Sequence, residues 1–209
     1  VASRGLGDVY KRQGILLIMN NVSIIPIKNL PEFEPKHDLV DEIIKTFSSN
    51  NFVLEDKDVI VITQKIVSKV EDRLIKNDNE SIEKLIQEES IEILRKRGDT
   101  VIARTKHGFI CANAGIDKSN IEKGLVLLLP EDPDKTSRDI RKKIEHVTNK
   151  KISIIISDTF GRAWRKGQTN VAIGSSGIQP LESYIGEKDA FDNELFATEI
   201  AIIDELAGA

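Results

Sequence analysis

The sequence has few of the residues that build disulfides and metal centres. Among 209 residues there is one cysteine, and the three histidines, His37, His107 and His146, are scattered. A single cysteine excludes a disulfide framework and a zinc finger, and the histidines lack the spacing of zinc ligands. We expect surface histidines and a small, buried Cys111. A chain of this length can bury about 70% of its unfolded surface, so it folds without such crosslinks.

An excess of positive charge is also lacking. Thirty Lys and Arg residues stand against 34 Asp and Glu, which leaves a net charge of −4. Proteins that bind nucleic acid or anionic membranes through their overall charge have a basic excess instead. We therefore expect a cytoplasmic, globular protein with no nucleic-acid partner and no membrane partner.

Two common phosphate and nucleophile motifs are absent. The stretch GRAWRKG, residues 161–167, is close to a P-loop, but Lys166 precedes the second glycine. The stretch GSSG, residues 174–177, has the wrong spacing for the nucleophile elbow of a hydrolase. Any phosphate chemistry must therefore use another arrangement.

The two ends of the chain differ from its middle. Residues 1–18 read VASRGLGDVYKRQGILLI, and RGLGDVYKRQ resembles translated sequencing-adapter sequence. We expect a non-native extension over 1–18 and one domain over 19–209; a genuine N-terminal extension is the alternative. The apolar run before Met19 is too short to span a bilayer. The last helical pattern has no clear stop signal, which predicts a C-terminally truncated domain.

Hydrophobic periodicity predicts an α+β fold of mixed sheets with flanking helices. We expect strands at residues 22–27, 58–63, 101–105, 108–112, 125–129, 152–156 and 171–173. We expect helices at residues 38–49, 82–98, 136–147 and 196–207. Thr136 and Asp139 have the spacing of a loose capping box at the start of the third helix.

Two segments that follow predicted strands carry polar residues suited to a ligand. Lys65 and Lys69 follow the strand at 58–63, where α/β folds place ligand contacts, and both could hold phosphate charge. Asp117 and Asn120 follow the strand at 108–112 and offer oxygen ligands. The alternatives are a solvated turn for the first segment and a turn rich in Asn, Asp and Gly for the second.

A third and a fourth segment adjoin each other. Asp158 and Thr159 end the most apolar strand, the position of many Mg²⁺ anchors; a helix cap is the alternative. The segment Gly161–Asn170 holds Arg162, Arg165 and the only tryptophan, Trp164. Arginine binds phosphate or carboxylate with two hydrogen bonds, and tryptophan stacks on flat rings; a nucleic-acid patch or a solvated loop is the alternative. Together the four segments indicate a metal–polyphosphate site without a P-loop.

Five blocks of the chain resemble the coenzyme F420-0:L-glutamate ligase family, the gamma-glutamyl ligases of deazaflavin biosynthesis. They read DVIVITQKIVSK, GFICANAGIDKSN, LLPEDPDKTSRDIR, ISDTFGRAWRKGQTNVAIGSSGI and ATEIAIIDELA. The resemblance runs from about Met19 to Ala209. It implies a family-specific ligase fold in an intertwined homodimer. It also implies a GTP-dependent acid–amino-acid ligase that adds L-glutamate to F420-0 through an acyl phosphate, then a gamma-linked glutamate.

The resemblance also implies site residues and cofactors. Asp117 and Asp158 match ligands of one divalent ion, with Thr159 at a second; the ions are Mg²⁺ or Mn²⁺, and K⁺ is a further candidate. The positions that match nucleotide contacts are Leu30, Pro31, Glu32, Phe33, Gln64, Lys65, Lys69 and Asn120. Family members continue past Ala209 into a glycine-rich segment that completes this site. Arg162 and Arg165 are predicted on charge alone, for phosphate or substrate carboxylate.

Two other functions fit the same residues. One is a different carboxylate–amine ligase that uses a metal and a nucleotide, which the identity of the acceptor would distinguish. The other is a non-catalytic nucleotide-binding module, which would bind ligand without hydrolysis that depends on Asp158. A nucleic-acid-binding basic loop would instead show a steep salt dependence of binding.

Overall fold

The computed structural model describes residues 22–77 and 81–209. The predicted extension over 1–18 lies outside these residues. The described chain forms two units: residues 27–180 with 201–209, and residues 22–26 with 181–200. Short helices and small sheets confirm the α+β class. Among the described residues, no helix is both long enough and apolar enough to cross a bilayer.

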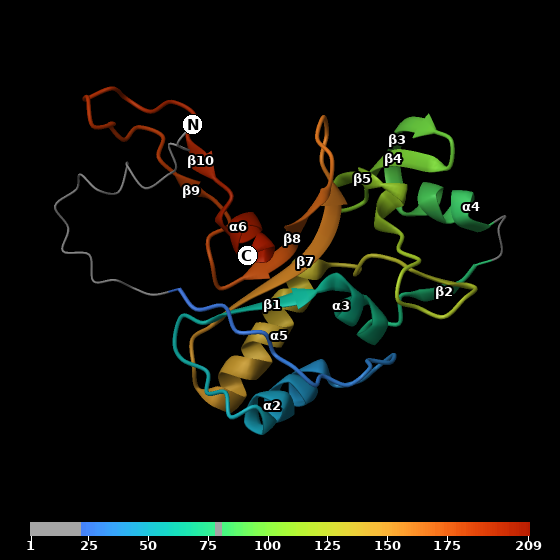
Figure 1. Ribbon diagram of the computed structural model, residues 1–209, viewed down its shortest axis with the longest axis horizontal. Coiled ribbons are helices and arrows are strands. Elements are labelled where there is room, and N and C mark those ends of the chain that lie inside the picture. Colours follow the sequence, from blue (N-terminus) through green and yellow to red (C-terminus); the bar gives the residue numbers. More distant parts are fainter. Residues whose placement is uncertain (1–21, 78–80) are drawn as a thin grey trace. The chain divides into compact units, whose positions relative to one another are not determined.

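The larger unit is built on a three-stranded sheet, drawn in Figure 1 with β7 between β1 and β8. Strand β1 (Val59–Thr63) runs parallel to β7 (Ser153–Gly161), and β8 (Gln168–Ser176) runs antiparallel to β7. The side chains of Ile154, Ile155 and Ile156 have no exposed surface. Because successive side chains of a strand point to opposite faces, β7 is covered on both faces.

Helices α2 (Leu39–Ser49) and α5 (Pro133–Thr148) build the core against this sheet. Helix α2 confirms the predicted amphipathic helix, and Asp38 caps it by accepting hydrogen bonds from two backbone N–H groups. The buried apolar side chains of this core are Phe33, Leu39, Val40, Ile43, Phe47, Leu54, Ile62, Val67, Leu129, Ile140, Ile144, Ile152, Ile154, Ile156 and Ile173.

Helix α5 confirms the helix expected from residue 136, but it begins earlier. Asp132 is the N-cap and Pro133 occupies the first turn, where its missing N–H costs nothing. The predicted capping box at Thr136 is wrong, because the Thr136 hydroxyl donates to the Glu71 carboxylate at 2.5 Å. Gly174 of β8 lies so close that a Cβ there would be 2.5 Å from the Pro133 carbonyl carbon.

The single helix expected over 82–98 is wrong in its second half. Helix α4 (Ser81–Glu88) ends, and the chain continues as β3 (Ser90–Arg97). Gly98, at φ +57°, turns the chain into β4 (Thr100–Thr105), which pairs with β3 and with β5 (Ile110–Ala112). The spacing of the apolar residues fits a helix, but residues 90–97 instead form a strand, because a two-residue hairpin turn lets them pair with β4.

The remaining elements agree with the sequence in part. Strand β2 (Leu74–Lys76) pairs with β6 (Leu125–Leu127), a shorter version of the strand expected over 125–129. The last helix is α6 (Ile202–Gly208), and it is fastened to β8 because the Asp204 carboxylate accepts a hydrogen bond from the Ala172 N–H at 2.8 Å.

Two predictions at the ends of the described chain are wrong. Residues 196–201 are not helical: β10 (Glu199–Ile200) pairs with β9 (Glu182–Ser183) in the smaller unit. Residues 22–27 form no strand, and Val22, Ile24 and Ile25 are exposed. An alternating pattern makes a strand only where a partner accepts its backbone hydrogen bonds.

Candidate functional site

Asp158 lies on β7 directly after the point where the parallel strand β1 ends. The register pairs Thr63, the last residue of β1, with Ser157, so Asp158 is the next residue along β7. On the other side, the β7–β8 register shifts between Ile156 and Ser157. Such a bulge bends a strand and re-aims the side chains that follow it. The sheet thus ends its regular pairing directly before Asp158.

Lys65 comes from helix α3 (Gln64–Val70), which starts immediately after β1. Residues 63–69, for which a solvated turn was the alternative, are therefore mostly helical. Burial lowers the pKa of Lys65 below its usual 10.5, and the Lys69 charge lowers it further, while the negative charge of Asp158 opposes the shift. Lys65 is thus close enough to Asp158 for the two charges to influence each other.

Asp117 reaches the same lysine from another part of the chain. Its backbone exchanges two hydrogen bonds of 2.9 Å with Leu127 of β6. Its carboxylate accepts a hydrogen bond from the Ser119 N–H at 2.7 Å and forms an ion pair with the Lys65 ammonium. The side chains of Lys65 and Asp117 are 26% and 21% exposed, so the pair is largely shielded from water.

The backbone before Asp117 is unusual. Asn113, Ala114 and Gly115, which form the 3₁₀ turn η1 (Asn113–Gly115), all have positive φ angles of 50–73°. A Cβ on Gly115 would lie 2.7 Å from the Leu129 side chain, so no other residue fits there without rearrangement. The predicted alternative of a turn rich in Asn, Asp and Gly is present, and it also delivers Asp117 to Lys65.

We call Asp117, Asp158 and Lys65 the carboxylate cluster. Burial raises the pKa of Asp158 above its usual 3.8, and the Thr159 backbone N–H and the Lys65 charge only partly offset this. The nearby thiol of Cys111 on β5 has its pKa raised to about 11, by burial first and by the Asp158 charge second. Cys111 is buried, as expected. Asp158 is thus a half-buried carboxylate whose charge is incompletely balanced.

The donor set of the cluster fits a hard divalent cation. The Asp117 carboxylate pairs with the Lys65 ammonium, and the Asp158 charge influences the pKa of the same lysine. The neighbouring Thr159 adds a hydroxyl, which donates to the Asn170 side-chain oxygen at 2.9 Å. Carboxylate and hydroxyl oxygens suit Mg²⁺ and Mn²⁺. Within residues 22–77 and 81–209, no three Asp, Glu, His or Cys side chains form a metal-binding group. A cation would therefore take further ligands from water or phosphate, as Mg²⁺ usually does.

Besides Lys65, the polar nucleotide positions predicted from the sequence lie in three places. Gln64 is 1% exposed; its carbonyl oxygen accepts from the Ser68 hydroxyl, and its amide nitrogen has no partner among the described residues. Lys69 forms an ion pair with Glu32 at 3.1 Å. Asn120 is exposed three residues after Asp117, at φ +55°.

The remaining nucleotide positions flank an apolar cavity of about 350 Å³. Leu30 and Phe33 line it, and Phe33 is buried in the core, whereas Pro31 is exposed. Thr63, Ser157 and Asn170 provide its polar lining, which brings the cavity next to the end of β1 and to the partner of Thr159. Sequence analysis assigned Asn170 no role, although it ends the basic segment.

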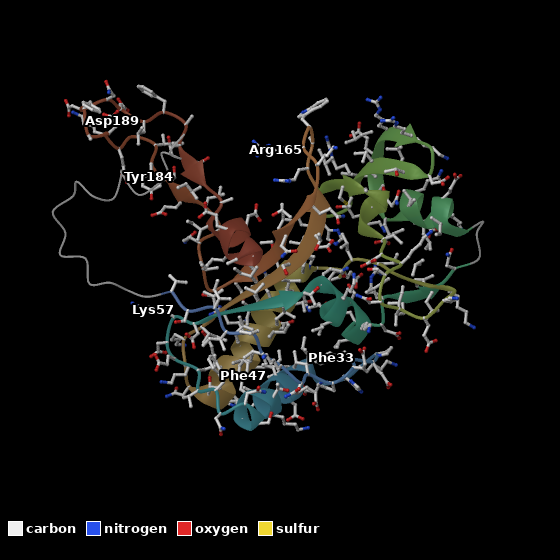
Figure 2. All side chains as sticks on the ribbon, viewed as in Figure 1. Phe33, Phe47, Lys57, Arg165, Tyr184 and Asp189 are labelled. Carbon is white, nitrogen blue, oxygen red and sulfur yellow. The ribbon has the colours of Figure 1, made fainter. Side chains whose placement is uncertain are left out.

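The structure does not bring Arg162 and Arg165 into contact with the carboxylate cluster. They lie in the hairpin tip, Gly161–Gly167, which connects β7 to β8 and rises above the sheet in Figure 1. Figure 2 shows Arg165 at this tip, and both arginines are exposed. Their predicted role in catalysis stays a prediction.

Comparison with known proteins gives one consistent result. A profile described as F420-0:Gamma-glutamyl ligase matches residues 28–209. A Methanococcus maripaludis S2 protein, named Coenzyme F420:L-glutamate ligase, is 45% identical over 183 residues, covering 79% of this chain and 71% of the relative. A Methanocaldococcus jannaschii protein of the same name is 44% identical over 173 residues, covering 75% and 69%.

Proposed function

The chain belongs to the F420-0:gamma-glutamyl ligase family, and on that premise we propose that it uses GTP to join L-glutamate to F420-0. The observation that carries this proposal is the carboxylate cluster. Asp117 and Asp158 come from separate parts of the chain: Asp117 forms an ion pair with Lys65, and the charge of Asp158 influences the same lysine. Such a site can bind phosphate together with a divalent cation, which a ligase driven by a nucleoside triphosphate needs.

The proposed reaction has two steps. A carboxylate oxygen of F420-0 attacks the γ-phosphorus of GTP, the bond to GDP breaks, and an acyl phosphate forms. The amino nitrogen of glutamate then attacks the acyl carbon, inorganic phosphate leaves with the electrons of the broken C–O bond, and the nitrogen releases its proton to solvent. A second round would add a gamma-linked glutamate in the same way.

Residues of the cluster would have distinct tasks in this reaction. Asp117 and Asp158 would hold one divalent ion, Mg²⁺ or Mn²⁺, and Thr159 would contribute to a second; K⁺ is a further candidate. When bound, such ions neutralise charge on the transferred phosphoryl group. Lys65 and Lys69 would bind phosphate oxygens as point charges, and Leu30 and Phe33 would contact the nucleotide from the apolar cavity. We also propose that the protein acts as a homodimer.

The test is a ligation assay read by mass spectrometry. The purified protein is incubated with F420-0, L-glutamate, GTP and Mn²⁺, and we expect a product heavier by one or more glutamyl units. Asp158→Asn keeps the shape of the side chain but removes its charge, so we expect turnover to fall by about 10³-fold. Arg138→Ala, an exposed arginine of α5, is the control that should retain activity.

Two outcomes would contradict the proposal. Full turnover by Asp158→Asn would remove the cluster from the mechanism. Absence of product while GTP still binds to the wild-type protein would favour a carboxylate–amine ligase with another acceptor. Turnover with ATP in place of GTP would correct only the nucleotide.

A further inference from the structure

The tip of the β7–β8 hairpin presents a tryptophan to solvent. Trp164 is the only tryptophan of the chain, and its surface is 101% exposed, as if it stood alone in water. Its φ of +62° is in the left-handed region, which bulky residues rarely adopt. In the described structure, no packing of the ring offsets the exposure of its apolar surface or the strain of its backbone. Because an exposed aromatic ring on a strained backbone does not stabilise the fold, we attribute this feature to function.

Positive charge surrounds this ring without being balanced. Arg162, Arg165 and Lys166 are all exposed, and within the described residues no carboxylate forms an ion pair with any of them. The Arg162 guanidinium donates to the Lys166 backbone oxygen at 2.7 Å, which closes the tip on itself. The charged groups of Arg165 and Lys166 therefore remain available for an anion.

The tip and the carboxylate cluster belong to one continuous ladder. Beyond the bulge, β7 and β8 pair without interruption from Ser157–Ala172 to Gly161–Gln168. Gly161 is three positions after Asp158, a span of about 10 Å at the rise of a β-strand. A ligand bound at the tip could thus extend along the hairpin toward Asp158.

We propose that the hairpin tip binds the acceptor: Trp164 stacks on the deazaflavin ring, while Arg165 and Lys166 bind its anionic tail. This inference rests on the proposed function, because it assumes an acceptor with a flat ring and a tail that ends in the reacting carboxylate. Stacking orients a ring without specific hydrogen bonds, and arginine binds phosphate or carboxylate oxygens in pairs. The tip thereby positions the carboxylate for attack in the carboxylate cluster.

A guanine nucleotide also has a flat ring and an anionic tail. The lysines proposed to bind its phosphates, Lys65 and Lys69, lie on α3, and the positions proposed for its base line the cavity near Phe33. The acceptor must approach the transferred phosphate from another direction, because its carboxylate attacks as the leaving GDP departs. The hairpin tip is a separate surface that is available for this second substrate.

The single tryptophan makes this proposal directly measurable. Titration of the wild-type protein with F420-0, without GTP or glutamate, should quench the fluorescence of Trp164 saturably. GTP with Mg²⁺ should leave this fluorescence nearly unchanged. A deazaflavin that lacks the anionic tail should quench as well, with about tenfold weaker affinity because the contact with Arg165 is missing.

Three variants at the tip and one control variant separate the ring contact from the charge contact. Arg165→Ala should weaken F420-0 binding about tenfold and leave the tail-less deazaflavin unaffected, whereas Arg138→Ala should change neither. Trp164→Leu, followed through the fluorescence of the deazaflavin itself, should weaken both ligands, and Trp164→Phe should restore most of the affinity. In the ligation assay, Arg165→Ala and Trp164→Leu should raise the KM for F420-0 and leave the KM for GTP unchanged.

The outcomes distinguish this inference from the proposed function. Ligation by the wild-type protein without quenching of Trp164, or with an unchanged KM in Arg165→Ala, would overturn the tip proposal and leave the ligase standing. Quenching without ligation would support the tip and contradict the ligase. Quenching by GTP as strong as that by F420-0, or tighter binding of a single-stranded oligonucleotide, would assign the tip to another ligand and overturn the proposal.

Discussion

The carboxylate cluster and the hairpin tip are both charged, and both depend on β7, yet they treat charge in opposite ways. In the cluster, Lys65 and Asp117 are about three-quarters buried and paired, and the pKa values of Lys65 and Asp158 are shifted. At the tip, Arg165 and its neighbours are exposed and without carboxylate partners in the described structure. A partly buried charge is costly unless it is paired, whereas an exposed charge is stabilised by water and remains available to bind a ligand.

The difference teaches how one hairpin can serve two tasks. Near the core, Asp158 is partly buried, and its incompletely balanced negative charge is suited to bind a divalent cation. Away from the core, Trp164 and the neighbouring cations make few contacts with the rest of the protein. Their side chains can therefore serve ligand binding with little effect on stability. Substitutions at the two regions should therefore act on different quantities.

The largest expected effect on stability comes from one methyl group at the packed end of the hairpin. Gly174→Ala would place a Cβ 2.5 Å from the backbone of Pro133, and we expect the free energy of unfolding to fall by about 3 kcal/mol. Gly161→Ala, at the tip end, meets nothing within 4 Å and should change stability by less than about 0.5 kcal/mol. Urea denaturation of both variants tests this contrast; equal midpoints would refute it.

The charge of Asp158 should also be detectable at Cys111. A thiol with its pKa near 11 instead of its usual 9.0 holds about 100-fold less thiolate at pH 8, so it should react slowly with a disulfide reagent in the folded protein. Because the folded thiol keeps its proton to higher pH than the unfolded one, this group lowers the free energy of unfolding as pH rises from about 9 to 11.

The same reagent gives a control for the source of the shift. Asp158→Asn removes the second of the two causes that raise the pKa of Cys111, and it should speed the reaction severalfold while the protein stays folded. An unchanged rate would mean that burial alone protects the thiol. Arg165→Ala at the tip should leave the rate as it is.

Removal of the Lys65 ammonium is expected to have a moderate effect on stability. In Lys65→Met, Asp117 loses its ion-pair partner and Asp158 loses a nearby positive charge. The pKa of Asp158 should therefore rise further, and the free energy of unfolding should fall by about 2 kcal/mol. Mg²⁺ should raise the melting temperature of this variant more than that of the wild type, because the cation replaces the lysine. Lys166→Met, at the tip, should match the wild type with and without Mg²⁺.

The smallest expected effect has the opposite sign. Trp164→Gly removes a ring that packs against nothing and relieves a φ of +62°, so we expect the protein to become more stable by about 1 kcal/mol. Binding of F420-0 should weaken at the same time. Thermal unfolding together with the binding assay would show this exchange of stability for function; a less stable variant would mean that the ring has a partner.

Much of the larger unit could be predicted from local patterns. The strand expected at 58–63 and the amphipathic helix expected at 38–49 occur within one residue of their predicted bounds. The apolar strand expected at 152–156 also occurs, but it continues through Asp158 to Gly161. Their signals are spacing and composition within one segment, which no distant contact reverses. The strand at 101–105 was also predicted and is present as β4. Its hairpin partner β3 could not be predicted in this way, because apolar residues at 82, 85, 86, 93 and 94 also fit a helix.

The candidate site shows the same division. Sequence patterns and the family resemblance selected Lys65, Asp117 and Asp158 and placed each after a strand. That Lys65 pairs with Asp117 and also lies within the electrostatic influence of Asp158 depends on β1 running parallel to β7 and on Asp117 pairing with β6. Strand register between distant segments leaves no mark on local spacing.

By itself, the sequence determined which residue types are available, where most of the strands and helices begin, and to which family the chain belongs. Only the tertiary structure decided which charges meet and which stay apart. It buried Asp158 beside Lys65 and Cys111 and left Arg165 at an exposed tip, although both lie on one hairpin. The physical reason is that burial and pairing are properties of surfaces brought together by folding, and these set the pKa values and the accessibility on which function depends.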